Sequence, residues 1–206
     1  MSECNMWEIE KEFYDKGFQL ICGVDEAGRG PLAGPVCAAA VILPAFVDIP
    51  GLNDSKKLTD KKRRELFPII QEKAVAYAIA FADHKEIDEI NILQATYLAM
   101  ERAIKALEIK PEFALIDGNR AKDFGLPVKT VVHGDSLSAS IAAASILAKV
   151  TRDRLMLELD AQYPDYQFAK HKGYPTALHQ QLVLEHGPCP EHRRTFLKKI
   201  YARAGK

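Results

Sequence analysis

The chain has 206 residues and a mass of 23.0 kDa, which fits one domain whose core needs no disulfide or structural metal. Its 28 basic and 28 acidic residues give zero net charge, whereas strong electrostatic binders of nucleic acid tend to be basic. No apolar run reaches the roughly 18 residues that cross a membrane, and residues 1–5 begin no secretion signal, so we expect a cytoplasmic protein without a membrane partner.

Five short apolar runs predict strands. In chain order they cover residues 18–24, 36–43, 74–82, 113–116 and 128–132. Three of them precede the first long stretch of helical spacing, and the last two follow it. This order predicts an α/β domain with a mixed sheet, in which an antiparallel meander is extended by parallel strands.

Helices are predicted between and after these strands. Thr59 and Asp60 can cap a basic helix, which Pro68 must either kink or end. Apolar residues recur at helical spacing over 87–107, and an Ala-rich helix is expected over 137–159. The C-terminal region is expected to be helical and basic. If the chain has an internal boundary, we place it near 164–174, where Pro, Gly and basic residues collect.

Basic residues gather in four clusters despite the zero net charge. They are Lys56, Lys57, Lys61, Lys62, Arg63 and Arg64; Lys149, Arg152 and Arg154; Lys170, His171 and Lys172; and His192, Arg193, Arg194, Lys198 and Lys199. One basic run is more often a solvated helix face than a binding surface. Four runs that flank acidic motifs make a track for phosphates an equal alternative, and both interpretations stay open.

The four cysteines do not have the spacing of a metal site. Cys4, Cys22, Cys37 and Cys189 form no C-x-x-C pair, and Cys22 and Cys37 lie inside apolar runs. We therefore expect reduced thiols rather than a zinc centre.

Acidic residues follow three of the predicted strands. Asp25 and Glu26 come after the first strand, Asp117 after the fourth and Asp135 after the fifth. Strand ends bring distant residues together, and four carboxylates there would repel one another unless a hard divalent cation neutralised them. Two such cations are the usual apparatus of phosphodiester hydrolysis. The alternative is that each Asp merely caps a turn, which the recurrence argues against.

A glycine-rich loop follows the first acidic pair. Successive strand residues face opposite sides, so Asp25 and Glu26 can share a metal site only if the strand unwinds, and the turn at 27–28 offers that place. Residues 28–34 could bind an anion through exposed backbone N–H groups. The loop does not match the nucleotide-binding P-loop, since Pro35 and Val36 stand where Lys and Ser/Thr belong, and it does not match the dinucleotide motif, because an apolar strand follows it.

At this point the sequence resembles a known family, bacterial ribonuclease HII, the type 2 ribonuclease H. The resemblance rests on ordered blocks from about residue 18 to residue 200. These are GVDEAGRGPL at 23–32, NDSKKL at 53–58, LIDGNR at 115–120, GDS at 134–136, AASILAKVTRD at 143–153, HKGYPT at 171–176 and HRRTF at 192–196. So many blocks in family order are far more specific than any single motif.

The resemblance implies a fold and an activity. The fold would be ribonuclease H-like, with a mixed five-stranded sheet flanked by helices and a small helical C-terminal portion. We thus expect one catalytic domain over 1–206, with roughly 165–206 as a helical substrate-binding appendage. The activity would be endonucleolytic, on RNA in RNA–DNA hybrids and on single ribonucleotides in duplex DNA. Cleavage would fall 5′ of the ribonucleotide, by a two-metal mechanism with Mg²⁺ or Mn²⁺, and leave 3′-hydroxyl and 5′-phosphate ends. The roles implied are ribonucleotide removal from DNA and RNA primer removal.

The resemblance also assigns residues. The catalytic, metal-binding carboxylates fall on Asp25, Glu26, Asp117 and Asp135. Substrate-binding residues fall on Gly28, Arg29, Gly30, Ser55, Lys56, Lys57 and Tyr174. The Gly28–Gly30 loop is expected to contact the 2′-hydroxyl, the one group that distinguishes RNA from DNA. Tyr174 is expected to pack on the next deoxyribose, with simple packing as the alternative. Lys56 and Lys57 are expected to hold phosphates, with a solvated helix start as the alternative.

Three further expectations complete the sequence interpretation. His133 stands where many relatives carry Lys, and we expect a surface residue there; Asp153 is expected to have a supporting role. We expect a monomer, and no protein-partner motif is recognised. The competing functions are a generic ribonuclease H-fold nuclease without junction specificity, which the Gly28–Gly30 loop with Tyr174 argues against, and a non-catalytic hybrid-binding protein, which the four carboxylates argue against.

Overall fold

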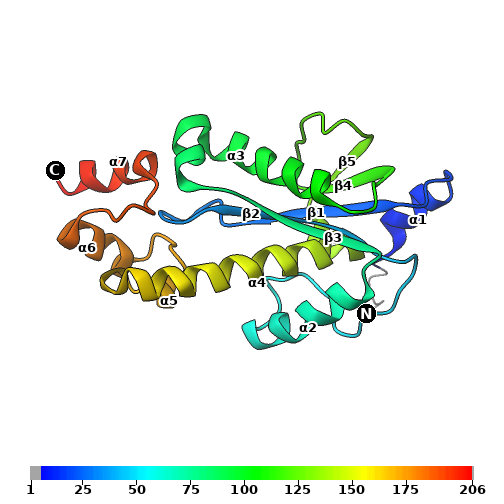
Figure 1. Ribbon diagram of the computed structural model, residues 1–206, viewed down its shortest axis with the longest axis horizontal. Helices are drawn as coiled ribbons and strands as arrows, with labels where there is room; N and C mark the ends of the chain where they lie inside the picture. Colours follow the sequence, from blue (N-terminus) through cyan, green and yellow to red (C-terminus); the bar gives the residue numbers. More distant parts are fainter. Residues whose placement is uncertain (1–5, 206) are drawn as a thin grey trace.

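The computed structural model describes residues 6–205 and contains one five-stranded sheet (Figure 1). The strands are β1 (Ile21–Ala27), β2 (Val36–Ile42), β3 (Ala76–Ala82), β4 (Phe113–Asp117) and β5 (Val128–Val131). The sheet order is β3-β2-β1-β4-β5, with β1, β2 and β3 antiparallel and β1, β4 and β5 parallel. The predicted mixed sheet, an antiparallel meander extended by parallel strands, is confirmed.

Helices cover both faces of this sheet. Figure 1 shows α3 (His84–Ala106) on one face and α4 (Ala139–Gln162) on the other, with α2 (Asp60–Lys73) beyond α4. The first core lies between the sheet and α3, and the second between the sheet, α2 and α4. Helix α1 (Glu8–Tyr14) packs on a third cluster with Phe113 and Ile141.

The contact between β1 and α4 depends on Gly23. A Cβ atom on this residue would lie 2.1 Å from the carbonyl carbon of Ser140 and 2.2 Å from the amide nitrogen of Ile141, both backbone atoms. Real Cβ atoms do not approach that closely, and backbone cannot give way as a flexible side chain can. Gly23 therefore lets α4 cross the central strand at close range, which brings residues of α4 next to the end of β1.

Two helices differ in detail from the sequence prediction. Helix α2 continues past Pro68 to Lys73, so the proline does not end it. Helix α3 is interrupted at Asn91, whose φ of 68° is left-handed, and the Asn91 side chain accepts hydrogen bonds from the N–H groups of Leu93 and Gln94. Asn91 thus acts as a cap for the second part of α3. None of the helices in residues 6–205 combines the length and apolar character that crossing a bilayer requires.

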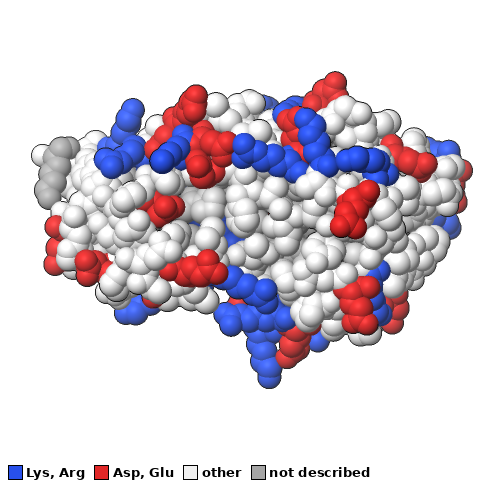
Figure 2. Space-filling view, in the orientation of Figure 1, with Lys and Arg blue, Asp and Glu red and all other residues white. Residues whose placement is uncertain are grey.

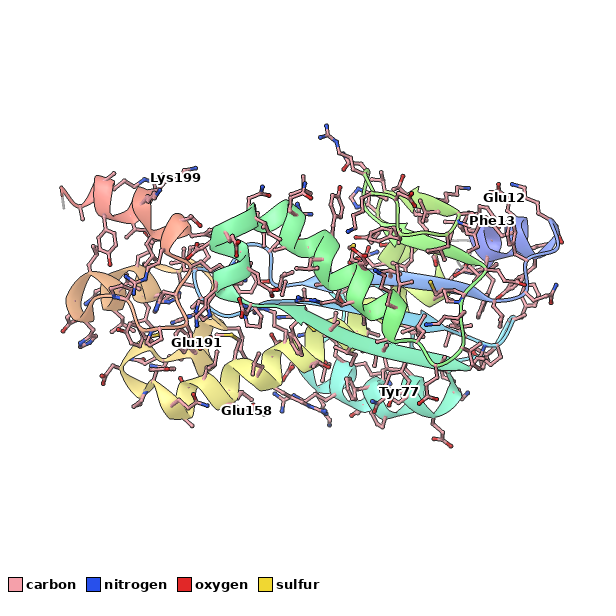
Figure 3. The ribbon with its side chains drawn as sticks, turned by 45° about the horizontal axis from the view of Figure 1, so that its top comes forward. Glu12, Phe13, Tyr77, Glu158, Glu191 and Lys199 are labelled. Atoms are coloured by element: carbon pink, nitrogen blue, oxygen red, sulfur yellow. The ribbon has the colours of Figure 1, made fainter. Side chains whose placement is uncertain are left out.

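The C-terminal region is helical, as predicted. After two short helical segments, Pro164–Tyr166 and α5 (Phe168–His171), come α6 (Ala177–His186) and α7 (Arg194–Arg203). This region shares an apolar cluster with Met156 and Leu159 of α4 and with Leu32 and Ala33 of the β1–β2 connection. Figure 3 shows Glu191 at this end of the molecule, opposite Glu12 and Phe13 of α1, and the Glu191 carbonyl accepts a hydrogen bond from Gly34 N.

Candidate active site

A cleft with a volume of about 270 Å³ lies beside the ends of β1 and β4. It is lined by Asp25, Glu26, Ala27, Gly28, Arg29, Gly30, Ser55, Lys56, Arg63, Asp117, Ser145, Lys149 and Tyr174. Nine of the eleven residues proposed from the sequence are among them. The other two, Asp135 and Lys57, do not line this cleft.

The sequence predicted Asp25 and Glu26 after the first strand, but both residues lie within β1. β1 pairs with β2 from Cys22 as far as Ala27, whereas its pairing with β4 stops at Val24. β1 continues through the acidic pair and ends at Ala27, so the strand does not unwind at Asp25 and Glu26 themselves, and the turn expected at 27–28 begins only after them. Both side chains still line the cleft, because the β4-facing edge of β1 is open beyond Val24 and Asp117 ends β4 beside it.

The fourth carboxylate is linked to the cleft through Lys56. Asp135 lies in a short 3₁₀ turn (Gly134–Ser136) and is 1% exposed, and its Oδ2 pairs with Lys56 Nζ at 2.7 Å. The adjacent Gly134 N–H donates to Asp117 Oδ1 at 2.7 Å, which ties this turn to the end of β4. Lys56 thus lies between the carboxylates of the cleft and Asp135.

The loop that carries Lys56 is held by a carboxylate that the sequence interpretation left without a role. Asp54 Oδ1 accepts from Lys56 N at 2.8 Å, and Asp54 Oδ2 accepts from Ser136 Oγ at 3.3 Å. Lys57 extends away from the cleft, 3.9 Å from Asp54 Oδ2, and lines a separate hollow with Met6 and Trp7. The structure therefore places Lys56, and not Lys57, in the cleft.

The electrostatics of the cleft show an excess of negative charge. Burial, followed by repulsion from Glu26 and Asp117, holds the pKa of Asp25 well above its ordinary value. Burial also raises the pKa of Glu26 and of Asp117, although Arg29 opposes the shift at Glu26 and the Gly134 N–H opposes it at Asp117. Burial acts to lower the pKa of Lys56, but its ion pair with Asp135 and the charges of Asp25 and Asp117 raise it overall. The positive charge of Arg29 and Lys56 is therefore too small to offset burial and mutual repulsion at Asp25, Glu26 and Asp117.

That donor set fits a divalent cation by its chemistry. Oxygen ligands from carboxylates are what Mg²⁺ and Mn²⁺ prefer, and a cation would remove the repulsion that raises these pKa values. Within residues 6–205, however, no three His, Cys, Asp or Glu side chains converge closely enough to form a preassembled metal site. The carboxylates are gathered along one cleft and would have to draw together around an ion.

Two buried arginines hold the glycine-rich loop in place. Arg193 is 0% exposed and donates to the carbonyls of Gly28, Arg29 and Gly34, at 2.7, 3.0 and 2.9 Å respectively. Arg152, also 0% exposed, donates to the carbonyls of Ala33, Pro35 and Lys172. Neither guanidinium can contact a phosphate. For these two residues both earlier interpretations of the basic clusters, solvated face and phosphate track, are wrong.

The arginines also orient the loop toward the cleft. In a trans peptide the C=O and the following N–H point in opposite directions. Because the Gly28 and Arg29 carbonyls point inward to Arg193, the N–H groups of Arg29 and Gly30 point away from it. A side chain at position 28 is excluded, since φ is +97° and a Cβ would lie 2.0 Å from Arg152 Nε. The loop thus presents backbone donors beside the acidic cleft.

Tyr174 lines the same cleft and lies beside Gly30 of this loop. Its ring is 3.7 Å from where a Cβ of Gly30 would be, and Lys149 Nζ lies 5.8 Å from the ring centroid. Lys149 is itself paired with Asp153 at 2.7 Å, which gives Asp153 the supporting place expected for it. Tyr174 remains 38% exposed, so part of its side chain is accessible to a ligand in the cleft.

Helix α4 supplies cleft residues that the sequence interpretation missed. Ser145 Oγ lies 2.8 Å from Ser55 Oγ and hydrogen bonds to Asp25, and Lys149 follows it by four residues on the same helix face. Arg63 lines the cleft too, but its Nη1 donates to the carbonyls of Ser55 and Leu58 and so supports the loop. Two signals were available inside this Ala-rich helix, the four-residue spacing and the family block over 143–153 that contains both residues.

Solved structures with a similar fold define the class of protein. Ribonuclease H2 from Pyrococcus horikoshii OT3 superimposes with a TM-score of 0.73 at 30% identity, over 90% of this chain and 99% of that one. Ribonuclease HII from Archaeoglobus fulgidus, solved in a complex with PCNA, superimposes with a TM-score of 0.70 at 26% identity, over 85% of this chain and 94% of that one. Bst ribonuclease HIII in complex with Mn²⁺ gives 0.68 at 22% identity, over 90% and 70%, and supports the fold alone. The chain has a ribonuclease H-like fold with an acidic cleft at the strand ends.

Sequence comparisons narrow the class to one family. The family model for ribonuclease HII matches residues 22–204. Ribonuclease HII of Caldicellulosiruptor saccharolyticus is 54% identical over 95% of this chain and 96% of its own length, and that of Aliivibrio fischeri strain MJ11 is 59% identical over 89% and 88%. The chain belongs to the ribonuclease HII family. It is therefore a type 2 ribonuclease H, a divalent-metal-dependent endonuclease that acts on RNA–DNA hybrids.

Proposed function

We propose that this enzyme nicks duplex DNA on the 5′ side of a single embedded ribonucleotide as well as cutting longer hybrids, and that it leaves 3′-hydroxyl and 5′-phosphate ends. The observation that carries the proposal is one cleft lined by Asp25, Glu26 and Asp117, by the Gly28–Gly30 loop, and by Tyr174. A single bound duplex would then contact both the residues that cut it and the residues that recognise its sugar. Its roles in the cell would be ribonucleotide removal from DNA and RNA primer removal.

The loop and Tyr174 would provide the selectivity. N–H groups of Arg29 and Gly30, turned outward by Arg193, can donate to the 2′-hydroxyl and the flanking phosphates, and glycines permit the close approach that this requires. The exposed part of the Tyr174 side chain would pack on the neighbouring sugar and favour one without a 2′-hydroxyl. A nuclease without junction specificity would need neither feature.

Asp25, Glu26, Asp117 and Asp135 would hold two divalent ions, Mg²⁺ or Mn²⁺. When bound, these ions activate water and stabilise the leaving oxygen. Lys56 would leave its ion pair with Asp135 and bind a substrate phosphate instead. Its side chain is 74% exposed, so its ammonium group can reach a ligand in the cleft. Ser55 and Ser145 would keep Asp25 oriented through their contact at 2.8 Å.

The duplex would extend from the cleft over basic surface. Figure 2 shows Lys and Arg side chains gathered over the N-terminal end of α2, which follows Lys56 and Lys57 in the chain. The first turns of α2 carry Lys61, Lys62, Arg63 and Arg64. Of these, Lys61 and Arg64 are exposed and could neutralise phosphates outside the cleft, where Lys57 could contribute as well.

The test is a labelled duplex that carries one ribonucleotide, incubated with Mg²⁺, with Mn²⁺ and with EDTA. We expect a nick with either ion and none with EDTA, because the carboxylates alone supply no activated water. An all-DNA duplex of the same sequence is the control and should stay intact. Cleavage that persists in EDTA would refute the metal mechanism, and cleavage of long hybrids alone would refute the junction specificity.

A further inference from the structure

Three buried histidines lie directly beneath the segment that carries Tyr174. His179 and His192 are 0% exposed and His171 is 7% exposed. The rings of His171 and His179 stack at 4.2 Å, and the Nε2 atoms of His179 and His192 lie 3.0 Å apart. No step of the proposed reaction uses these side chains, and the sequence interpretation placed His171 and His192 in basic clusters and in two of the family blocks without a role of their own.

Backbone groups at both ends set the direction of the hydrogen bonds between His192 and His179. The N–H of Cys189 donates to His192 Nδ1 at 3.0 Å, so this nitrogen is unprotonated and the proton of neutral His192 is on Nε2. At the other end the Tyr174 carbonyl can only accept, so His179 Nδ1, 3.0 Å away, carries the proton. The bond between the rings therefore runs from His192 Nε2–H to His179 Nε2. Both ends require the same arrangement.

His171 is fixed in the same manner and holds the other side of the segment. Its Nδ1 accepts from Gly173 N at 3.2 Å, so its Nε2–H donates to the Tyr166 carbonyl at 2.9 Å. The His171 carbonyl accepts from Tyr174 N at 2.9 Å. The backbone of Tyr174 is thus held at its N–H by the His171 carbonyl, and at its C=O by His179 Nδ1 together with the N–H of Thr176 at 2.8 Å.

The cluster requires neutral histidines, and its surroundings keep them so. Burial, and then repulsion between the rings, lowers the pKa of His179 to about 4 and that of His192 to about 3. Burial lowers the pKa of His171 as well. The ionisable groups facing the three rings are Asp160 of α4, Lys172, Arg194 of α7, the Cys189 thiol and the Tyr166 phenol. His179 and His192 therefore stay neutral from pH 8 down to well below pH 6, and the neutral form of His171 is favoured by the same burial.

We infer that a directed hydrogen-bond relay, in which His192 sets the tautomer of His179, fixes Tyr174 over the Gly28–Gly30 loop, which makes His179 a positioning residue for substrate selection. The inference rests on the role proposed above for Tyr174. The relay also joins the two recognition elements. His192 forms an isolated β-bridge with Ala33, and Gly173 O accepts from Leu32 N at 2.7 Å. Loss of the His179 donor to the Tyr174 carbonyl therefore alters where Tyr174 lies relative to the loop.

Two substitutions of His179 separate this role from general packing. The Asn amide nitrogen occupies the place of histidine Nδ1, so His179→Asn keeps the donor to Tyr174 O, whereas His179→Gln places its amide near Nε2 and loses that donor. The measurement is kcat/KM on a single-ribonucleotide duplex divided by kcat/KM on a long hybrid. We expect His179→Gln to lower this ratio about fivefold, the effect of one lost hydrogen bond. His179→Asn should stay within about twofold of wild type.

The same pair of variants in a Tyr174→Ala background tests whether the effect passes through Tyr174. There, His179→Gln and His179→Asn should give the same ratio. Equal ratios for the two variants in the wild-type background, or an undiminished difference in Tyr174→Ala, would overturn the inference. Histidine ¹⁵N spectra of the wild type provide the independent measurement. Nε2–H on His192 with Nδ1–H on His179 is expected, and the opposite tautomers would refute the relay even if Tyr174 selects the sugar. A Tyr174→Ala enzyme with a wild-type ratio would instead refute the proposed role of Tyr174.

Discussion

Replacing Asp25 with Asn is expected to reduce cleavage by roughly a thousandfold or more, because metal-bound activation of the attacking group is worth several kcal/mol. Duplex affinity should change little, since the loop and the lysines that would contact the substrate are untouched. The fold should also tolerate the change. Asp25 is buried beside Glu26 and Asp117 with its pKa raised, so a neutral amide relieves repulsion. We expect the free energy of unfolding to equal or exceed that of the wild type.

Three measurements check this prediction: single-turnover cleavage, duplex binding in the presence of Ca²⁺ or EDTA, and urea unfolding. Asp15→Asn, an exposed change at the end of α1, serves as the matched control and should behave as wild type in all three. Wild-type turnover by Asp25→Asn would refute a metal-binding role for Asp25. A loss of activity that came with a comparable loss of stability would assign Asp25 to the fold instead.

Replacing Arg193 with Met is expected to lower the free energy of unfolding by about 3 kcal/mol or more, because buried carbonyls that lose their donor keep the full cost of desolvation. Three carbonyls depend on this guanidinium, and two of them belong to Gly28 and Arg29. Methionine fills a similar volume but donates no hydrogen bond. The loop should also lose its orientation, so we expect cleavage of single-ribonucleotide duplexes to fall with stability.

The neighbouring arginine provides the control for this variant. Arg194 is exposed, and Arg194→Met should change stability by less than about 0.5 kcal/mol. The free energy of unfolding of Arg193→Lys should be closer to that of Arg193→Met than to that of the wild type. An ammonium group cannot replace the planar guanidinium that donates to three carbonyls. Equal stability of Arg193→Met and Arg194→Met in urea unfolding would contradict the role assigned to Arg193.

The sheet was predictable because its signals are local. Apolar runs such as 36–43 and 113–116 identify strands by composition, and their order gives the mixed topology. The end of β1 was not predictable from composition, since Asp and Glu are unusual in strands. They remain in β1 because the pairing with the small residues of β2 continues from Ala39 to Cys37.

Of the residues that form or support the cleft, only those inside recognisable sequence motifs were predictable. Asp25, Glu26 and Asp117 stand at predicted strand ends, and the glycine loop follows directly. The places of Arg152 and Arg193 were not predictable, because runs of basic residues are ordinarily solvated and all but one of their carbonyl partners lie more than 100 residues away in sequence. The same holds for His179, which no basic run includes and whose partner His192 belongs to another segment.

The central claim is that one cleft both recognises the ribose and cuts beside it, and the position of the nick tests this most directly. A duplex with one ribonucleotide, labelled in turn at each end of the ribonucleotide strand, should be cut by the Mn²⁺-loaded enzyme at one bond only. The account predicts the phosphodiester on the 5′ side of the ribonucleotide, with a 3′-hydroxyl on one product and a 5′-phosphate on the other. Cleavage on the 3′ side, or at bonds between deoxyribonucleotides, would contradict it.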